Sequence, residues 1–157
     1  MARIKIELPE AFHFSTLIPI RITDLNYGKH VGNDAVLSII HEARMQFLKK
    51  NGCTEMDLAG VSIIMADVAI EFKNELFYED TVIASVAAGE FTKVGFELFY
   101  KLEKVLRPFN PSASSGLRAQ DGKKITVSIA KTGMVCFDYE KKKITSLPAL
   151  AKQKLSN

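Results

Sequence analysis

A short polar segment, residues 24–33, contains the residue types best suited to chemistry. Its sequence is Asp-Leu-Asn-Tyr-Gly-Lys-His-Val-Gly-Asn, with a carboxylate at Asp24, a carboxamide at Asn26 and an imidazole at His30. A carboxylate or an imidazole can accept a proton from water in a transition state, and a carboxamide can orient that water. These residue types therefore fit a site at which water attacks a carbonyl carbon.

Two glycines in this segment, Gly28 and Gly32, would let the backbone pass close to a ligand. A helical pattern follows, so amides near Val31 and Gly32 are expected at the positive end of a helix, where they can stabilise an oxyanion. An Asx turn before a capped helix has the same Asp-x-Asn-x-Gly pattern. The sequence alone leaves both interpretations open.

Three more charged residues occupy positions that need an explanation. Arg44 falls within the apolar stripe of the predicted helix and requires a partner, for which Asp24, Glu71 and Asp67 are candidates. A structural ion pair between helix and sheet is its expected role. Glu42 lies on the polar side of the same helix, facing solvent or an interface. Asp67 interrupts an apolar strand, where a carboxylate is either paired or functionally perturbed.

The elements that position these residues follow from hydrophobic periodicity. Residues 16–22 alternate as a strand entered past Pro19, a position that suits an edge strand or a strand's start. Residues 33–51 have a helical period, with an apolar stripe and lysines at the end of the segment. Asn33 is the expected N-cap, and Gly52 stands where a left-handed residue commonly ends a helix.

After the helix the period is two almost to the end of the chain. Strands are expected within residues 64–72, 82–88, 94–102 and 125–137. The connections at 74–79 and 89–92 are too short for helical crossovers, so neighbours should be antiparallel. The sequence therefore predicts a single α+β domain, residues 1–157, in which a curved antiparallel sheet of about five strands wraps one long central helix.

Composition narrows the classes of function. The 157 residues include 21 basic and 18 acidic side chains, and the resulting charge of +3 is too small to predict a nucleic-acid partner. No segment has the apolar length of a signal peptide or a membrane span, which predicts a cytoplasmic protein without a membrane partner. Cys53 and Cys136 form no ligand-like cluster, so we predict packing roles for them and no metal.

Two further expectations concern surfaces. Exposed sheet edges predict a homodimer or homotetramer with the ligand site at a subunit junction. The long irregular stretch 107–122 is expected to be a mobile tip rather than an ordered lid.

Residues 21–44 resemble the hot-dog fold acyl-CoA thioesterases of the 4-hydroxybenzoyl-CoA thioesterase type. Those enzymes carry a pattern close to D-x-D-x-x-G-H-V-N-N before the central helix and E-x-R within it. The matching residues are Asp24, His30, Val31, Asn33, Glu42 and Arg44. The resemblance extends over nearly the whole chain and implies hydrolysis of an acyl-CoA or related acyl thioester, with coenzyme A present only as part of the substrate.

The chain departs from this pattern at three positions. Asn26 stands where many of these enzymes have a catalytic aspartate, Lys29 replaces a glycine, and Gly32 replaces the first asparagine. The chain resembles a bacterial branch with D-x-N-Y-G-x-H-x-G-N-D followed by H-E-A-R, so the asparagine belongs to that variant. An acid or base would then come from Asp24, His30, Asp67 or, across a dimer junction, Glu42.

The expected site follows from these residues. The predicted catalytic residues are Asp24, Asn26, His30 and Asp67. The predicted substrate contacts are Gly28, Val31, Gly32, Asn33 and Glu42. Basic residues suited to the phosphates of coenzyme A are Lys73, Lys101, Arg107, Arg118, Lys123 and Lys124.

Two other functions are compatible with parts of the pattern. A non-catalytic module that binds an acyl thioester or an acyl carrier protein would not need the missing aspartate. A hot-dog enoyl-CoA hydratase also uses Asp, Asn and His, in the pattern D-x-N-P-x-H. That match fails in detail, because no proline follows Asn26 and His30 lies one position too far from Asp24.

Overall fold

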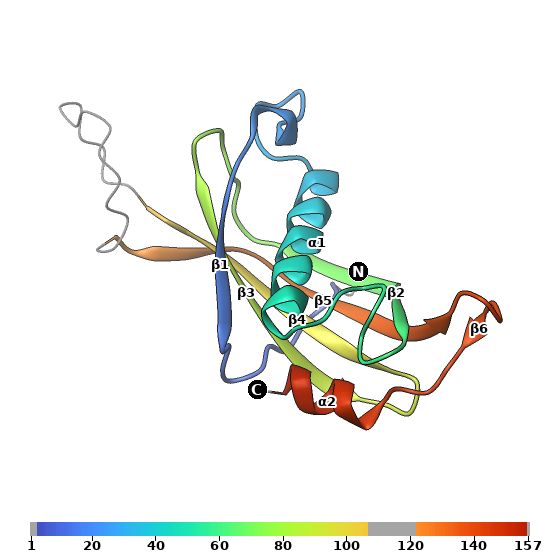
Figure 1. Cartoon of the computed structure of the whole chain (residues 1–157). Helices are drawn as coiled ribbons and strands as arrows, with labels where there is room; N and C mark the ends of the chain where they lie inside the picture. The colour runs from blue at the N-terminus through green and yellow to red at the C-terminus, as the bar shows by residue number, and fades with distance from the viewer. Residues whose placement is uncertain (1–2, 107–121, 157) are drawn as a thin grey trace.

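The computed structural model describes residues 3–106 and 122–156, and these form a curved sheet around a long helix (Figure 1). The sheet consists of β1 (Phe14–Pro19), β2 (Ser62–Phe72), β3 (Thr81–Phe91), β4 (Gly95–Val105), β5 (Lys124–Asp138) and β6 (Lys143–Ile144). The helical elements are the 3₁₀ turn η1 (Ile22–Asp24), α1 (Asn33–Lys50) and α2 (Ala149–Leu155). The predicted α+β architecture, with one long helix wrapped by an antiparallel sheet, is confirmed.

The strand order is β1-β3-β4-β5-β2, every pairing is antiparallel, and β6 pairs with β5. The expectation of antiparallel neighbours is correct for β3 and β4 but wrong for β2 and β3, because β2 pairs with β5. The connection from β2 to β3 passes the start of α1 instead. There Val31 N donates to Leu76 O at 2.9 Å, and His30 forms an isolated bridge with Phe77.

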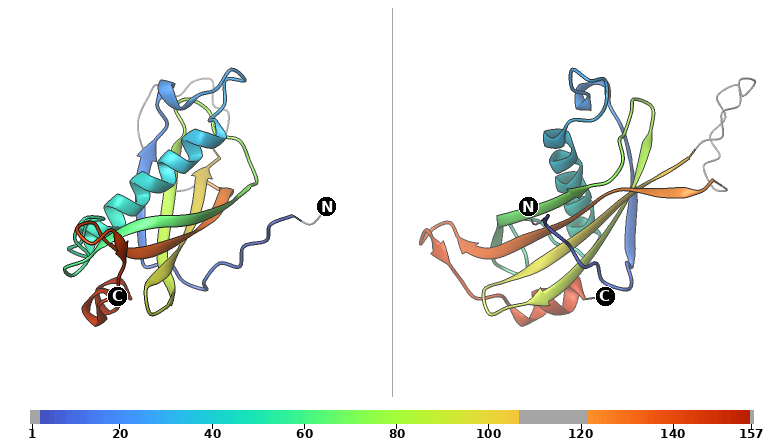
Figure 2. Two further views of the ribbon diagram at one scale, coloured as in Figure 1. Left: turned by 90° about the vertical axis from the view of Figure 1, so that its right-hand side faces the viewer. Right: turned by 180° about the vertical axis from the view of Figure 1, so that it is seen from behind.

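Helix α1 lies on the concave face of the sheet, as the further views in Figure 2 show, and its apolar stripe is buried. Ile40, Ala43 and Leu48 are completely buried, and they share the core with the similarly buried Leu98 and Tyr100 of β4. The predicted helix is confirmed, including Gly52, whose φ of 65° is left-handed. The predicted cap is wrong, because Gly32 is the N-cap and Asn33 is already helical.

Strand β1 ends earlier than the sequence predicted. Pro19 is its last residue, and the chain then turns through η1, which leaves Ile22 exposed. The edge position inferred from Pro19 is confirmed, since β1 pairs only with β3 among the described strands. The consequence for the polar segment is direct: Asp24 and Asn26 do not share the face of a continuous strand.

The sequence analysis missed two elements near the C terminus, β6 and α2. Helix α2 follows Pro148, buries Ala151 and Leu155, and lies near the β3–β4 turn, where Leu147 N donates to Lys93 O. In the described part of the chain no helix has both the length and the apolarity to cross a membrane. The predicted mobile tip lies outside the described residues except for Gly122.

Both cysteines, Cys53 and Cys136, are buried free thiols, and burial raises the pKa of each. Their expected role in packing is confirmed.

Candidate functional site

Asp24 holds the start of the polar segment together. Its carboxylate accepts hydrogen bonds from the Arg21 backbone N at 2.8 Å and from Arg21 Nη2 at 3.0 Å, and its carbonyl accepts from Gly32 N at 3.1 Å. Burial raises the pKa of Asp24, but the hydrogen bonds and charge of Arg21 outweigh it, so the net pKa is lowered. Asp24 is thus an ionised, fully engaged carboxylate that ties η1 to the N-cap of α1.

Asn26 forms the Asx turn that the sequence left as an alternative. Its Oδ1 accepts a hydrogen bond from Gly28 N at 2.8 Å, and its backbone N donates to His30 O at 2.9 Å. A Cβ at Gly28 would lie 2.9 Å from His30 Nε2 and 3.1 Å from Asn26 Oδ1. The amide and the imidazole therefore both pack against Gly28, and a side chain at this position would displace them.

The backbone amides at the helix start are not arranged as predicted. Val31 N donates to Leu76 O and Gly32 N donates to Asp24 O, so neither amide is available to a ligand. The amides of Asn33, Asp34 and Ala35 come next, and none of them has an acceptor within the described residues. The reason is the N-cap: glycine has no side chain to accept from the first turn. The unsatisfied amides therefore begin at Asn33, one residue later than predicted.

His30 lines a cavity of about 210 Å³ beside this helix start, which we call the His30 cavity. Its lining residues are His30, Val31, Asn33, Val36, Phe72, Lys73, Asn74, Glu75, Leu76 and Val127. His30 Nδ1 lies 3.2 Å from Val31 O, and Nε2 lies 4.0 Å from Glu75 Oε1. If Nδ1 carries the proton and donates to that carbonyl, Nε2 has a free lone pair and can accept a proton.

A second hollow of about 320 Å³, the Asp24 groove, lies between β1 and the exposed side of α1. Its lining residues are Ile18, Pro19, Arg21, Asp24, Ser38, Ile39, His41, Glu42 and Met45. The expectation that acid, amide and imidazole meet is therefore only partly correct. Asn26 and His30 are brought together, whereas Asp24 and Glu42 line a different hollow from His30. Glu42 Oε1 there accepts a hydrogen bond from Gln46 at 2.7 Å.

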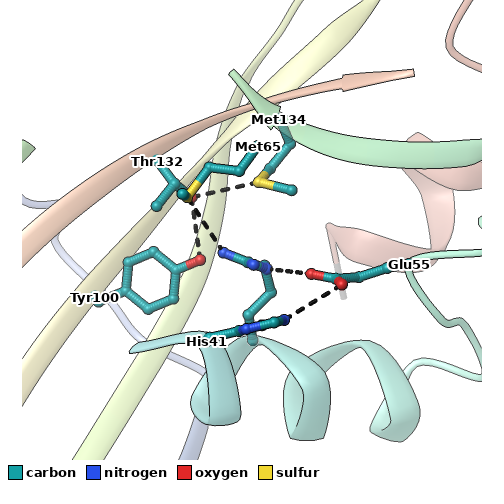
Figure 3. Close-up of polar contacts among 7 residues, drawn as sticks. His41, Glu55, Met65, Tyr100, Thr132 and Met134 are labelled. Atoms are coloured by element: carbon teal, nitrogen blue, oxygen red, sulfur yellow. Dashed lines mark hydrogen bonds and ion pairs between the residues drawn. The ribbon is translucent and has the colours of Figure 1, made fainter. Parts of the chain in front are cut away.

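Arg44 has a partner that the sequence analysis did not consider. Its Nε donates to Glu55 Oε1 at 2.7 Å, and the other oxygen of Glu55 lies 3.3 Å from His41 Nε2 (Figure 3). Burial raises the pKa of Glu55, yet Arg44 and His41 together leave it lowered. Arg44 forms a structural ion pair, as predicted, but the pair joins α1 to the loop after it rather than to the sheet, and none of Asp24, Glu71 and Asp67 is the partner.

The inner end of Arg44 reaches Met65 of β2. Its Nη1 lies 3.7 Å from Met65 Sδ, and the buried Tyr100 hydroxyl bonds Thr132 Oγ1 at 3.1 Å. Burial raises the pKa of Tyr100, so it stays protonated. This ion pair and these hydrogen bonds hold α1 and the loop after it against the sheet.

Asp67 is exposed rather than embedded in an apolar environment. A β-bulge between Met65 and Asp67 shifts the register by one residue, so that Asp67 stands opposite Gly133. A bulge reverses which residues face inward, because successive strand residues point to opposite faces. The carboxylate packs over Gly133, where a Cβ would be 2.5 Å from Asp67 Oδ2, and it lines neither hollow.

Residues 72–76 form one side of the His30 cavity, which was not predicted from the sequence. Lys73 N and Asn74 N donate to Val127 O at 2.9 and 3.0 Å, which anchors this connection to β5. Lys73 was predicted only as a contact for the phosphates of coenzyme A. Its Nζ forms an ion pair with Glu71 Oε2 at 3.1 Å. No local pattern marks these residues, because they reach His30 through long-range topology. No group of three ligand-type side chains that suits a metal occurs among residues 3–106 and 122–156.

The chain matches a known protein family. Residues 20–155 match the family model described as the thioesterase-like superfamily. No curated protein matches the chain.

Solved structures resemble the chain along most of its length. A thioesterase superfamily protein from Jannaschia sp. CCS1 has a TM-score of 0.73 at 14% identity, covering 94% of this chain and 83% of its own. A mutant of 4-hydroxybenzoyl-CoA thioesterase, complexed with 4-hydroxybenzoyl-CoA, has a TM-score of 0.72 at 15% identity, covering 91% and 98%. The 1,4-dihydroxy-2-naphthoyl-CoA thioesterase from Synechocystis has a TM-score of 0.70 at 16% identity, covering 90% and 94%. These likenesses confirm the predicted hot-dog fold.

Proposed function

Because the chain belongs to the thioesterase-like superfamily, we propose that it hydrolyses an acyl-CoA or a related acyl thioester to a free acid and a thiol. One observation carries the proposal: His30 and Asn33 line the same cavity. Asn33 is the first residue of α1, and no side chain in the described part of the chain caps the amides that open this helix. A proton acceptor and an oxyanion donor are the two groups that attack of water on a thioester requires.

The proposed reaction begins with the thioester carbonyl oxygen at the Asn33 amide. His30 Nε2 removes a proton from a water molecule as the water oxygen bonds to the carbonyl carbon. The carbon–sulfur bond then breaks, and the sulfur takes the proton from His30. General-base catalysis of this kind contributes roughly 10²–10⁴-fold, and one oxyanion donor about 10²–10³-fold.

The predicted site residues take different roles in this proposal. Asn26 supports His30 at Gly28 and has its Oδ1 committed to the Asx turn. Asp24 acts as a positioning residue through Arg21 and Gly32 rather than as a base. Val31 and Gly32 shape the loop, and their amides are used by the fold. Glu42 and Asp67 have no part in the proposed reaction within one chain.

We also propose that the protein acts as a homodimer or higher oligomer. Both β1 and β2 have one edge without a strand partner among the described strands, and open edges of this kind favour pairing with another chain. A cytoplasmic location, the absence of a separate cofactor, and an acyl carrier protein as an alternative carrier of the acyl group remain part of this proposal.

A panel of acyl-CoA substrates with thiol detection tests the proposed function. Release of free thiol by the purified protein is the expected result. Binding without thiol release would indicate a non-catalytic module, which the asparagine at position 26 makes the main alternative. Loss of enoyl absorbance without thiol release would indicate a hydratase, and either of these results would overturn the proposal.

A further inference from the structure

The inner face of β2 bears an apolar strip that α1 leaves partly open. In the β2–β5 register, Val68 stands opposite Thr132 and Phe72 opposite Ser128, and both β5 residues are completely buried. Directly opposed residues share a face of the sheet, so Val68 and Phe72 point toward the helix side. They are nevertheless 37% and 52% exposed.

Met65 belongs to the same strip. It stands opposite the buried Met134, on the helix side, and is itself exposed. Ile70, opposite the buried Ala130, lies between Val68 and Phe72 on the same face and is half-buried. We call Met65, Val68, Ile70 and Phe72 the β2 strip, and of the four only Phe72 lines the His30 cavity. Val68 begins about 13 Å farther along the strand, since four residues of a strand rise about 3.3 Å each. Phe72 therefore stands where the cavity meets the rest of the strip.

The size of the His30 cavity limits what it can hold. A cavity of about 150 Å³ lined by apolar side chains is enough for benzene. The His30 cavity, at about 210 Å³, has room for an acyl group of roughly one ring or a short chain. Its apolar lining residues are Val31, Val36, Phe72, Leu76 and Val127, and the rest of its lining is polar.

We propose that Phe72 sets the upper size limit of the acyl group by closing the His30 cavity toward the β2 strip. The inference rests on the proposed function and adds a substrate class to it: thioesters of short or single-ring acids. A long acyl chain would have to pass the Phe72 ring to reach Val68 and Met65. Removing the ring joins the cavity to the strip and extends the acyl site along β2.

The test compares wild type with Phe72→Ala on linear acyl-CoA substrates of increasing chain length. Wild type should have its highest kcat/KM with short chains. The variant should raise the ratio of long-chain to short-chain kcat/KM by about tenfold or more, since a single methylene in an apolar pocket changes selectivity about 10- to 200-fold. Phe72→Trp should narrow the range instead.

Tyr139→Ala is the matched control, because the exposed fraction of this aromatic side chain, 51%, is similar to that of Phe72, and Tyr139 lines neither hollow. It should keep the wild-type profile. A wild-type preference for long chains, or an unchanged profile in both Phe72 variants, would overturn the inference.

Affinities for S-alkyl-CoA thioethers of the same lengths provide a readout that needs no turnover. If wild type releases no thiol, the proposed function fails, and the thioether affinities still decide the role of Phe72. A shift of the preferred length in Phe72→Ala supports the size limit, and equal length dependence in wild type and variant contradicts it.

Discussion

The two hollows beside α1 contain similar polar residues. In the Asp24 groove these residues are hydrogen-bonded within the protein, whereas in the His30 cavity some of them have no hydrogen-bond partner among residues 3–106 and 122–156. In the Asp24 groove, Asp24 is bound to Arg21, Glu42 to Gln46, and His41 to Glu55. In the His30 cavity, the nearest charged partner of His30 Nε2 is Glu75 Oε1 at 4.0 Å, beyond hydrogen-bond distance, and the amides that open α1 have no acceptor among the described residues. The larger hollow is thus internally bonded, and the smaller one has groups left for a ligand.

The difference shows how a polar cluster in a fold can be assigned a role. A buried polar group that the fold already satisfies, such as Asp24, stabilises the protein, and detaching it for a ligand would cost about 1–3 kcal/mol, whereas the exposed Glu42 and His41 are bound more weakly. A group without a protein partner can bind substrate without that cost. The comparison therefore assigns the scaffold to the Asp24 side and the chemistry to the His30 side, and the following variants separate the two.

Glu55→Ala should have the largest effect on stability. It leaves the buried Arg44 guanidinium without its carboxylate, and removing one partner of a buried pair costs about 3–5 kcal/mol. Chemical denaturation measures the loss. The folded protein should keep its kcat, and Glu55→Gln should lose less stability. A large loss of kcat with unchanged stability would contradict this account, because it would place the chemistry on the Asp24 side of α1.

Gly32→Ser should slightly raise stability and leave kcat within about threefold of wild type. An N-cap side chain accepts from the second or third amide of a helix, here Asp34 or Ala35, so the Asn33 amide proposed for the thioester oxygen stays free. The nearest atom to the new Cβ, Asp34 Oδ1 at 2.5 Å, is the end of a side chain that can rotate away. A loss of about 10²–10³-fold in kcat in a capped, folded variant would place the oxyanion donor at Asp34 or Ala35 and contradict its assignment to Asn33.

Asp24→Asn should have a smaller effect on stability than Glu55→Ala, and this effect depends on pH. The pKa of Asp24 is lowered in the folded state, so the carboxylate stabilises the protein above its unfolded pKa, and this contribution is lost as pH falls through the folded pKa. The variant should be less stable than wild type by about 1–3 kcal/mol near neutral pH, and the gap should shrink below about pH 4. Urea denaturation at the two pH values measures it.

Asp67→Asn is the control for that experiment. Because Asp67 is exposed on the outer face of the sheet, the free energy of unfolding of this variant should stay within about 0.5 kcal/mol of the wild-type value at both pH values. A gap between wild type and Asp24→Asn that does not change with pH would exclude the ionised carboxylate as the stabilising form.

The sequence predicted the elements whose signals are local and periodic. The stripe of α1, Gly52 at its end and the long alternating strands each depend on residues close in sequence. The same holds for the Asx turn at Asn26, which the sequence presented as one of two interpretations. His30 was correctly placed near the helix start for this reason.

Features that depend on distant residues were not predictable in this way. Leu76 occupies the Val31 amide only because the β2–β3 connection crosses the helix start, and Glu55 satisfies Arg44 only because the loop after α1 folds back. One bulged residue reverses the direction of Asp67. In each case a single long-range contact changed whether a predicted group was available for chemistry.

The most direct test of this account is the kcat of His30→Gln beside that of His41→Gln, with an acyl-CoA that wild type hydrolyses. Both variants replace a histidine near α1 with the same neutral residue, one in each hollow. We expect His30→Gln to lower kcat by roughly 10²–10⁴-fold and His41→Gln to change it by less than about threefold. Full activity in His30→Gln, or an equal loss in His41→Gln, would contradict the assignment of the chemistry to the His30 cavity.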